Sequence, residues 1–170
     1  MNQVMENIKA RRSIRKYKDE KLSKEEIEYL LSAAMSAPSA GNAQPWEFVV
    51  IDNKEILNEI PKFHQYSSML KEASHAILVC GNIDLEKYQG FWVQDCSAAT
   101  QNMLLAATAK DIGSVWLGVY PEEDRIEGLR KLLDLPDNVI PFSLVSLGYP
   151  AENKGSVDRY SEDKVHYNKY

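Results

Sequence analysis

The sequence has 170 residues, of which 44% are hydrophobic and 26% are charged, and its formal net charge is −5. These values are typical of a globular protein, and the length favours a single domain, residues 1–170, with a sizeable core. No apolar run is long enough to cross a bilayer and residues 1–10 are too polar for a signal peptide, so we expect a cytoplasmic protein. Cys80 and Cys96 lack the spacing of a metal site, which predicts reduced, packed thiols.

Charge is unevenly distributed along the chain. The first 24 residues contain eight Lys and Arg but only three Asp and Glu, whereas the remainder is acidic. A basic segment in an acidic protein favours a small anionic partner such as a phosphate over a nucleic acid. The sequence also lacks the glycine-rich dinucleotide motif, the P-loop and the G-x-S-x-G motif, so dinucleotide folds, P-loop enzymes and α/β-hydrolases are disfavoured.

The first half of the chain alternates helical and strand patterns. We predict a short helix over Asn2–Ala10, and a second helix that begins at a capping box of Ser23 and Glu26 and ends near Ser36. The continuously apolar run Phe48–Ile51 predicts a strand that is buried on both faces. A short helix over residues 55–60 should end at a proline, and the polar loop that follows makes His64 a predicted surface residue.

The second half repeats this alternation. Strands are predicted at residues 74–81, 114–120 and 139–147, and helices at 91–111 and 122–133. The helix at 91–111 is rich in alanine, which predicts burial on all sides, in part by a second subunit. We expect Gly113 to be the C-cap of this helix, and Pro141 to mark a sheet edge or a bulge. The polar tail, residues 150–170, should wrap over the surface of this chain or of a partner subunit.

The run from Arg11 to Tyr17 is the strongest candidate for binding an anion. In an extended chain, Arg11, Ser13 and Arg15 lie on one side. Two guanidinium groups with a hydroxyl between them suit a phosphate dianion, because the planar forks bind its oxygens through paired hydrogen bonds. The alternative is a solvated cluster of surface charges.

A second candidate is the loop from Ala37 to Phe48. Pro38 and Pro45 restrict the backbone and make this loop stiff and extended. Ser39, Asn42 and Gln44 place short polar groups on that frame, as in loops that contact a flat polar ligand. The alternative is an ordinary helix-to-strand connection.

The arginine run, the proline-framed loop and the sequence Leu147-Gly148-Tyr149-Pro150 together resemble the nitroreductase family of FMN-dependent oxidoreductases. The resemblance covers nearly the whole chain. It implies an α+β fold, a three-layer α/β/α sandwich with a mixed, mainly antiparallel sheet. It also implies an intertwined homodimer with FMN at the interface.

The resemblance further implies which residues hold FMN. Arg11, Arg12 and Ser13 would bind the phosphate and ribityl end, with Arg159 returning to the phosphate, and Arg15 would face flavin N1 and O2. The loop of the other subunit would supply Pro38, Ser39, Ala40 and Asn42, and the strand end whose amides approach N5 and O4 would be Trp116, Leu117 and Gly118. Leu117 replaces an acidic residue common in relatives, and the chain is too short to hold the helical insertion that often covers the active site.

By the same resemblance, NAD(P)H would transfer hydride to flavin N5, and a small electron-poor acceptor such as a nitroaromatic or quinone would then be reduced in a ping-pong reaction. FMN would carry the chemistry, with no dedicated catalytic side chain and no metal. The alternatives are a specialised flavin chemistry, such as reductive dehalogenation or flavin fragmentation, and a flavin-binding or regulatory protein without NAD(P)H turnover. An anion-binding module that uses only the arginines is a third possibility.

Overall fold

One antiparallel sheet organises the protein in a computed structural model that describes residues 2–170. The strand order across the sheet is β1-β2-β4-β3. These strands are β1 (Trp46–Ile51), β2 (His75–Asn82), β3 (Gly113–Gly118) and β4 (Val139–Gly148). Since β2 and β4 are central and almost wholly buried, β1 and β3 form the two edges.

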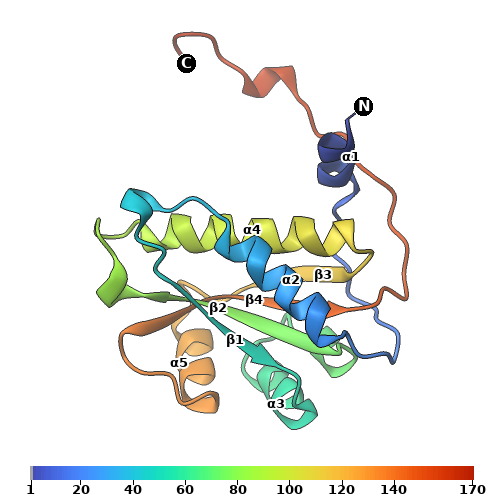
Figure 1. Cartoon of the computed structure of the whole chain (residues 1–170), viewed down its shortest axis with the longest axis vertical. Coiled ribbons are helices and arrows are strands. Elements are labelled where there is room, and N and C mark those ends of the chain that lie inside the picture. Colours follow the sequence, from blue (N-terminus) through green and yellow to red (C-terminus); the bar gives the residue numbers. More distant parts are fainter. Residues whose placement is uncertain (1) are drawn as a thin grey trace.

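Helices cover both faces of this sheet (Figure 1). The described α-helices are α1 (Gln3–Ala10), α2 (Lys24–Met35), α3 (Lys54–Glu59), α4 (Trp92–Ala109) and α5 (Glu123–Leu132). On one face lie α2 and α4, and on the other lie α3 and α5. Successive side chains of β4 pack against opposite helix layers. Val145 belongs to one hydrophobic cluster and Leu144 to the other. These observations confirm the predicted α+β sandwich. Within residues 2–170, the parallel pairing is one isolated bridge between Ser13 and Ser114.

The expected capping box starts α2. The Ser23 hydroxyl accepts a hydrogen bond from the Glu26 amide, and the Glu26 carboxylate accepts one from the Ser23 amide. The buried face of α2 then packs on α4, where the Asn102 side chain donates to the Ala33 carbonyl. However, Gln94 and Gln101 of α4 are exposed in the single chain, so the prediction that a second subunit completes the burial of this helix stays a prediction.

Three local predictions have different outcomes. The prediction that β1 is buried on both faces is wrong, because β1 is an edge strand and Val50 is 41% exposed. Gly113 is not the C-cap of α4 but the first residue of β3, and the left-handed conformation falls on Asp111, with φ of 55°. Of the two alternatives predicted at Pro141, a sheet edge or a bulge, the structure shows the bulge, since β4 is a central strand and its register with β2 shifts where Cys80 pairs with Pro141.

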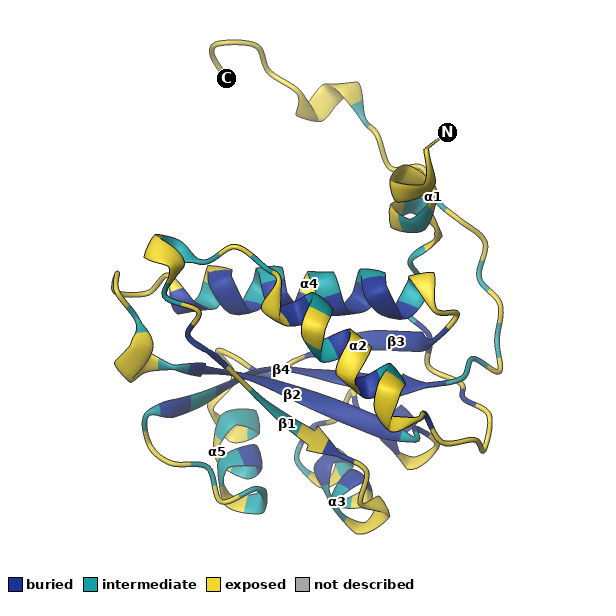
Figure 2. Ribbon diagram, viewed as in Figure 1, coloured by how far each residue is buried: buried dark blue, intermediate teal, exposed yellow. Residues whose placement is uncertain are grey.

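Helix α1 and the C-terminal tail lie outside the three layers. No residue of α1 is buried, and its Asn7 side chain donates to the Leu105 carbonyl of α4. The first part of the tail runs beside the N-terminal segment, where the amides of Ala151 and Val157 donate to the carbonyls of Lys16 and Lys9. The rest of the tail extends away from the body and is exposed (Figure 2). Within residues 2–170, none of the helices has the length and apolarity needed to span a membrane.

Candidate functional site

The arginine run is held in an extended conformation against the sheet. The Ile14 amide donates to the Ser114 carbonyl at 3.0 Å, and the Lys18 amide donates to the Tyr149 carbonyl at 2.8 Å. Ile14 and Tyr17 are buried and anchor this segment. Arg11 and Arg12 precede these anchors and Arg15 lies between them. All three are therefore held beside β3 and β4 without being part of the core.

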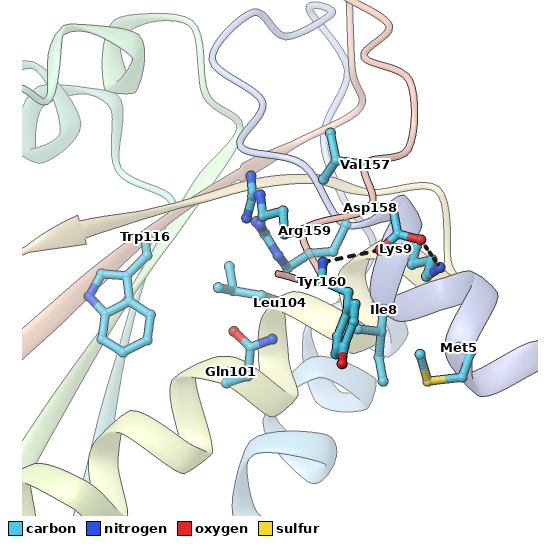
Figure 3. Close-up of a pocket in the computed structure, with 11 residues that line it drawn as sticks. Met5, Ile8, Lys9, Gln101, Leu104, Trp116, Val157, Asp158, Arg159 and Tyr160 are labelled. Atoms are coloured by element: carbon cyan, nitrogen blue, oxygen red, sulfur yellow. Dashed lines mark hydrogen bonds and ion pairs between the residues drawn. The ribbon is translucent and has the colours of Figure 1, made fainter. Parts of the chain in front are cut away.

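A cavity of about 610 Å³ lies beside this segment, between α1, α4, β3 and the tail (Figure 3). Its lining includes Arg11, Arg159 and Trp116, together with Gln101 and Leu104 of α4. Burial, followed by the charges of Arg159 and Arg12, lowers the pKa of Arg11 from its ordinary value. Guanidinium groups that repel one another in this way form a region of positive potential, which favours an anion.

Arg12 lies on the other side of the segment, as the alternation of an extended chain predicts. It lines a neighbouring cavity of about 260 Å³ with Gly113 and Lys154. The Arg12 Nε and Nη1 atoms are buried and have no hydrogen-bond partner within residues 2–170. Lys154 is already engaged, because its Nζ donates to the Ser13 carbonyl at 2.7 Å. Arg12 is therefore the guanidinium with unused buried donors in this cluster.

A third cavity, of about 400 Å³, meets the first at Trp116. Arg15, Leu117 and Gly118 line it, together with His64 and Arg125. An ideal Cβ at Gly118 would meet only Arg125 Nη1, at 4.0 Å, so the space above this glycine is open.

The backbone of β3 presents hydrogen-bonding groups to the same space. The Ser114 carbonyl points away from β4, because it accepts from Ile14. Alternation along an antiparallel strand then directs the backbone groups of Trp116 and Gly118 to the free edge, and those of Leu117 toward β4. Alternation thus favours Gly118 over Leu117 as the free amide at this edge.

The structure overturns the prediction that His64 is a surface residue. Its side chain is only 1% exposed, and Nε2 lies 2.9 Å from the Gly118 carbonyl oxygen. Arg125 Nη1 donates to the same oxygen at 2.8 Å. The sequence gives no signal for this, because His64 lies in a polar stretch without periodicity and meets β3 only through the fold.

The proline-framed loop is well anchored. The Ala40 amide donates to the buried Asp95 carboxylate at 2.9 Å, and Lys87 Nζ donates to the Gly41 carbonyl at 2.7 Å. The Gln44 amide donates to the Ser39 hydroxyl at 2.9 Å, which fixes the turn from within. Pro38 and Asn42 are exposed.

This loop lies at the opposite edge of the sheet from the arginine cluster. It leads directly into β1, whereas Trp116 and Gly118 lie on β3. Three strand spacings of about 4.8 Å separate these edges, or roughly 14 Å. Within one chain, the predicted site residues therefore form two separate groups.

The described residues contain no group of His, Cys, Asp and Glu that could hold a metal ion. Cys80 and Cys96 are free and buried, and burial raises the pKa of the Cys80 thiol to about 12. Both thiols are therefore protonated and unreactive at neutral pH, in agreement with the prediction of packed cysteines.

Comparisons with known proteins address the family. The model of the nitroreductase family matches residues 8–78 and 62–149. A Methanothermobacter thermautotrophicus protein, provisionally named NADH dehydrogenase/NAD(P)H nitroreductase, is 53% identical over 167 residues, covering 98% of this chain and 87% of that protein. The crystal structure of a Parabacteroides distasonis protein with the same provisional name has a TM-score of 0.96 at 40% identity, with 100% of both chains covered.

Two further relatives differ in what their names state. A protein from Desulfovibrio desulfuricans, provisionally named a nitroreductase and solved in complex with FMN, has a TM-score of 0.86 at 31% identity, covering 100% of this chain and 99% of that chain. An iodotyrosine deiodinase from Thermotoga neapolitana is 27% identical over 195 residues, with 100% of both proteins covered. The family match includes the arginine run, the proline-framed loop and β3. The chain belongs to the nitroreductase family.

Proposed function

We propose that this protein is an FMN-dependent oxidoreductase that transfers hydride equivalents from NAD(P)H to a small, electron-poor acceptor such as a nitroaromatic or a quinone. The observation that carries the proposal is that Arg11 and Arg159 line the cavity beside the open edge of β3, with Arg12 on the other side of the same segment. When bound, FMN would supply the hydride-accepting and hydride-donating chemistry, and the protein would bind and orient the reactants.

The donors present fit the phosphate of FMN. Within residues 2–170, Arg12 has two buried guanidinium nitrogens without a partner, and burial together with the charges of Arg159 and Arg12 lowers the pKa of Arg11. The unused donors of Arg12 and the like charges around Arg11 both favour an anion at this segment, because charge-assisted hydrogen bonds between guanidinium and phosphate are strong. We assign Arg11, Arg12 and Arg159 to this end of the cofactor, with the Ser13 hydroxyl beside them.

The other end of the site suits a flat ring with polar edges. Trp116 joins the two cavities, Gly118 leaves open space, and its amide faces the free edge of the strand. Arg15 lines the same cavity and would place positive charge near the ring. We assign no catalytic side chain, because these residues bind and orient the ring and do not transfer protons.

We further propose that each site is completed by the loop of a second copy of this chain, through Pro38, Ser39, Ala40 and Asn42. The support is the separation of this loop from Arg11 and Gly118 within one chain. Helix α1 also leaves Val4, Met5 and Ile8 exposed, and an uncovered apolar helix face favours association.

The test is anaerobic stopped-flow spectroscopy of the purified protein reconstituted with FMN. We expect a stoichiometric yellow complex whose flavin absorbance bleaches with NADH or NADPH and returns when a nitroaromatic or quinone is added. Failure to bind FMN would contradict the proposal. It would favour the alternative that the protein is an anion-binding module.

A flavin complex that neither NADH nor NADPH bleaches would favour the other functions. Because one relative is named an iodotyrosine deiodinase, the acceptor panel should include a halogenated tyrosine given to the dithionite-reduced protein. Release of halide would then indicate reductive dehalogenation. No turnover with any acceptor would indicate a flavin-binding or regulatory protein.

A further inference from the structure

We propose that His64 and Arg125 are positioning residues, which together fix the peptide group after Gly118 and thereby hold the end of β3 in place where the flavin would meet it. This inference rests on the proposed function. Neither residue belongs to the arginine run or to the proline-framed loop.

Two donors from different parts of the chain converge on one oxygen. The distances to the Gly118 carbonyl oxygen are 2.9 Å from His64 Nε2 and 2.8 Å from Arg125 Nη1. The Arg125 guanidinium also lies over the Tyr66 ring, 5.6 Å from its centroid, which restricts its motion. A carbonyl with two such donors has both of its acceptor positions occupied.

The hydrogen bond determines the tautomer of His64. The Gly118 carbonyl can only accept, so His64 Nε2 must carry a hydrogen. Burial, and the charge of Arg125 to a smaller extent, lower the pKa of His64, which favours the neutral ring. His64 is therefore a neutral donor with a bare Nδ1, and this Nδ1 is buried without a partner within residues 2–170.

The backbone of His64 is fixed independently of its ring. Its amide donates to the Ile60 carbonyl at 3.0 Å, and its own carbonyl accepts from the buried Ser67 hydroxyl at 2.7 Å. The ring therefore extends from a rigid turn to the end of the edge strand. A positioning role requires such a fixed base for the His64 ring, because the Gly118 carbonyl that the ring contacts belongs to a residue with a flexible backbone.

Gly118 needs such support for two reasons. Glycine has the widest conformational freedom of any residue, and Gly118 is exposed at the last position of β3. On the side of β4, the next hydrogen bond is the 3.3 Å contact from the Val119 amide to the Phe142 carbonyl. The Val119 amide and the Gly118 carbonyl belong to one planar peptide group. Without His64 and Arg125 this group would keep the long hydrogen bond to Phe142 as its restraint, so the end of β3, including the Gly118 amide, would move more freely.

The test uses single and matched variants of the FMN-loaded protein. His64→Leu removes one donor and Arg125→Met removes the other, whereas His64→Gln keeps an amide donor on a side chain of similar reach. Lys131→Ala, which removes an exposed cation elsewhere on α5, controls for net charge. The measurements are the FMN dissociation constant, the flavin midpoint potential and the anaerobic rate of flavin reduction by NAD(P)H.

We expect His64→Leu and Arg125→Met to slow flavin reduction roughly ten- to hundred-fold, because small misplacements of an orienting group have effects of this size. The midpoint potential should shift with the rate, while FMN affinity, which depends on the distant phosphate end, changes less than the rate. His64→Gln should recover most of the rate, and Lys131→Ala should match the wild type. Unchanged rates and potentials in both His64→Leu and Arg125→Met would overturn the inference.

A second measurement does not depend on turnover. In the protein without FMN, ¹⁵N NMR should find His64 as the neutral Nε2–H tautomer, and His64→Leu should speed hydrogen exchange at the Val119 amide, which shares a peptide group with the Gly118 carbonyl and donates to Phe142. Another tautomer, or unchanged exchange, would contradict the inference even if the protein does not bind FMN. If the wild type binds FMN but is not reduced, the proposed function fails while this measurement still decides the role of His64.

Discussion

Arg15 offers the most direct test at the scale of a single residue. It lines the cavity beside Gly118, apart from the cluster of Arg11 and Arg159. A positive charge near the ring should stabilise the negative charge that reduction adds, so Arg15→Gln should lower the FMN midpoint potential by roughly 30–60 mV. Affinity for oxidised FMN should change little. A redox titration decides: an unchanged midpoint with weaker FMN binding would place Arg15 at the phosphate instead.

The histidines predict how stability depends on pH. Burial lowers the pKa of both His64 and His75 below the ordinary value of 6.5. Below pH 6.5 the unfolded chain therefore binds more protons than the folded chain, and the free energy of unfolding should fall with falling pH. Urea denaturation of the protein without FMN, at about pH 7.5 and about pH 5, measures this change.

His64→Gln should reduce this pH dependence, and His166→Gln in the exposed tail is the matched control. The carboxylates with lowered pKa, Glu26, Glu152 and Asp158, do not interfere. Their contribution to stability is present above their unfolded values of 4.5 for Glu and 3.8 for Asp, and it is lost only at lower pH. An equal pH dependence in His64→Gln and the wild type would show that His64 is not kept neutral by the fold.

The residue scale also shows which features the sequence can predict. The location of Arg11 and Arg15 beside cavities that meet at Trp116, with Arg12 on the other side, was predictable because charge and alternation are local properties of an extended chain. His64 was not, because its burial depends on a turn that brings it to a strand more than fifty positions later. A polar residue without periodic neighbours gives no sign of the surface that it meets.

At the scale of elements, Gly113 connects the fold to the site. A Cβ on Gly113 would lie 2.8 Å from Ile14 Cγ2 and 3.1 Å from the Gly148 carbonyl oxygen. Gly113→Ala should therefore push the arginine segment away from β3, lowering stability by about 1–3 kcal/mol and weakening FMN binding. Chemical denaturation and FMN titration measure the two effects. Gly155→Ala, which has nothing within 4 Å of its Cβ, should change neither.

Element predictions succeeded where one segment contained the whole signal. The Ser23 and Glu26 capping box and the bulge at Pro141 are examples, since each follows from local backbone chemistry. The burial of β1 was mispredicted because an apolar run does not reveal whether a strand is central or at an edge. That depends on the strand order, which only the assembled sheet determines.

At the scale of the whole molecule, the distribution of the predicted site residues favours a site shared by two chains. The loop with Ala40 leads into one edge strand, and Arg11 lies beside the other. The family resemblance implied this division, but composition and periodicity could not, because both describe one chain at a time. The exposed apolar residues of α1 and the extended tail are further surfaces that a second copy could cover.

Mixed dimers test whether each FMN site is divided between two chains. Arg11→Ala damages the phosphate end, and Ala40→Phe places bulk on the loop, so each variant alone should bind FMN weakly, by roughly ten- to hundred-fold for Arg11→Ala. In a dimer of one Arg11→Ala chain and one Ala40→Phe chain, a shared site combines either both damaged parts or both intact parts. FMN titration of differently tagged, purified mixed dimers should therefore find one tight site per dimer.

The matched control carries both substitutions on one chain and none on the other. Each shared site then contains one damaged part, so no tight site should remain. If instead each chain formed its own site, the two results would be exchanged: the control would keep one tight site in its unchanged chain, and the mixed dimer would have none. Both dimers contain the same two substitutions and differ only in whether these lie on two chains or on one. The pair of titrations therefore distinguishes a site formed by two chains from a site formed by one chain, and it does so without relying on catalytic activity.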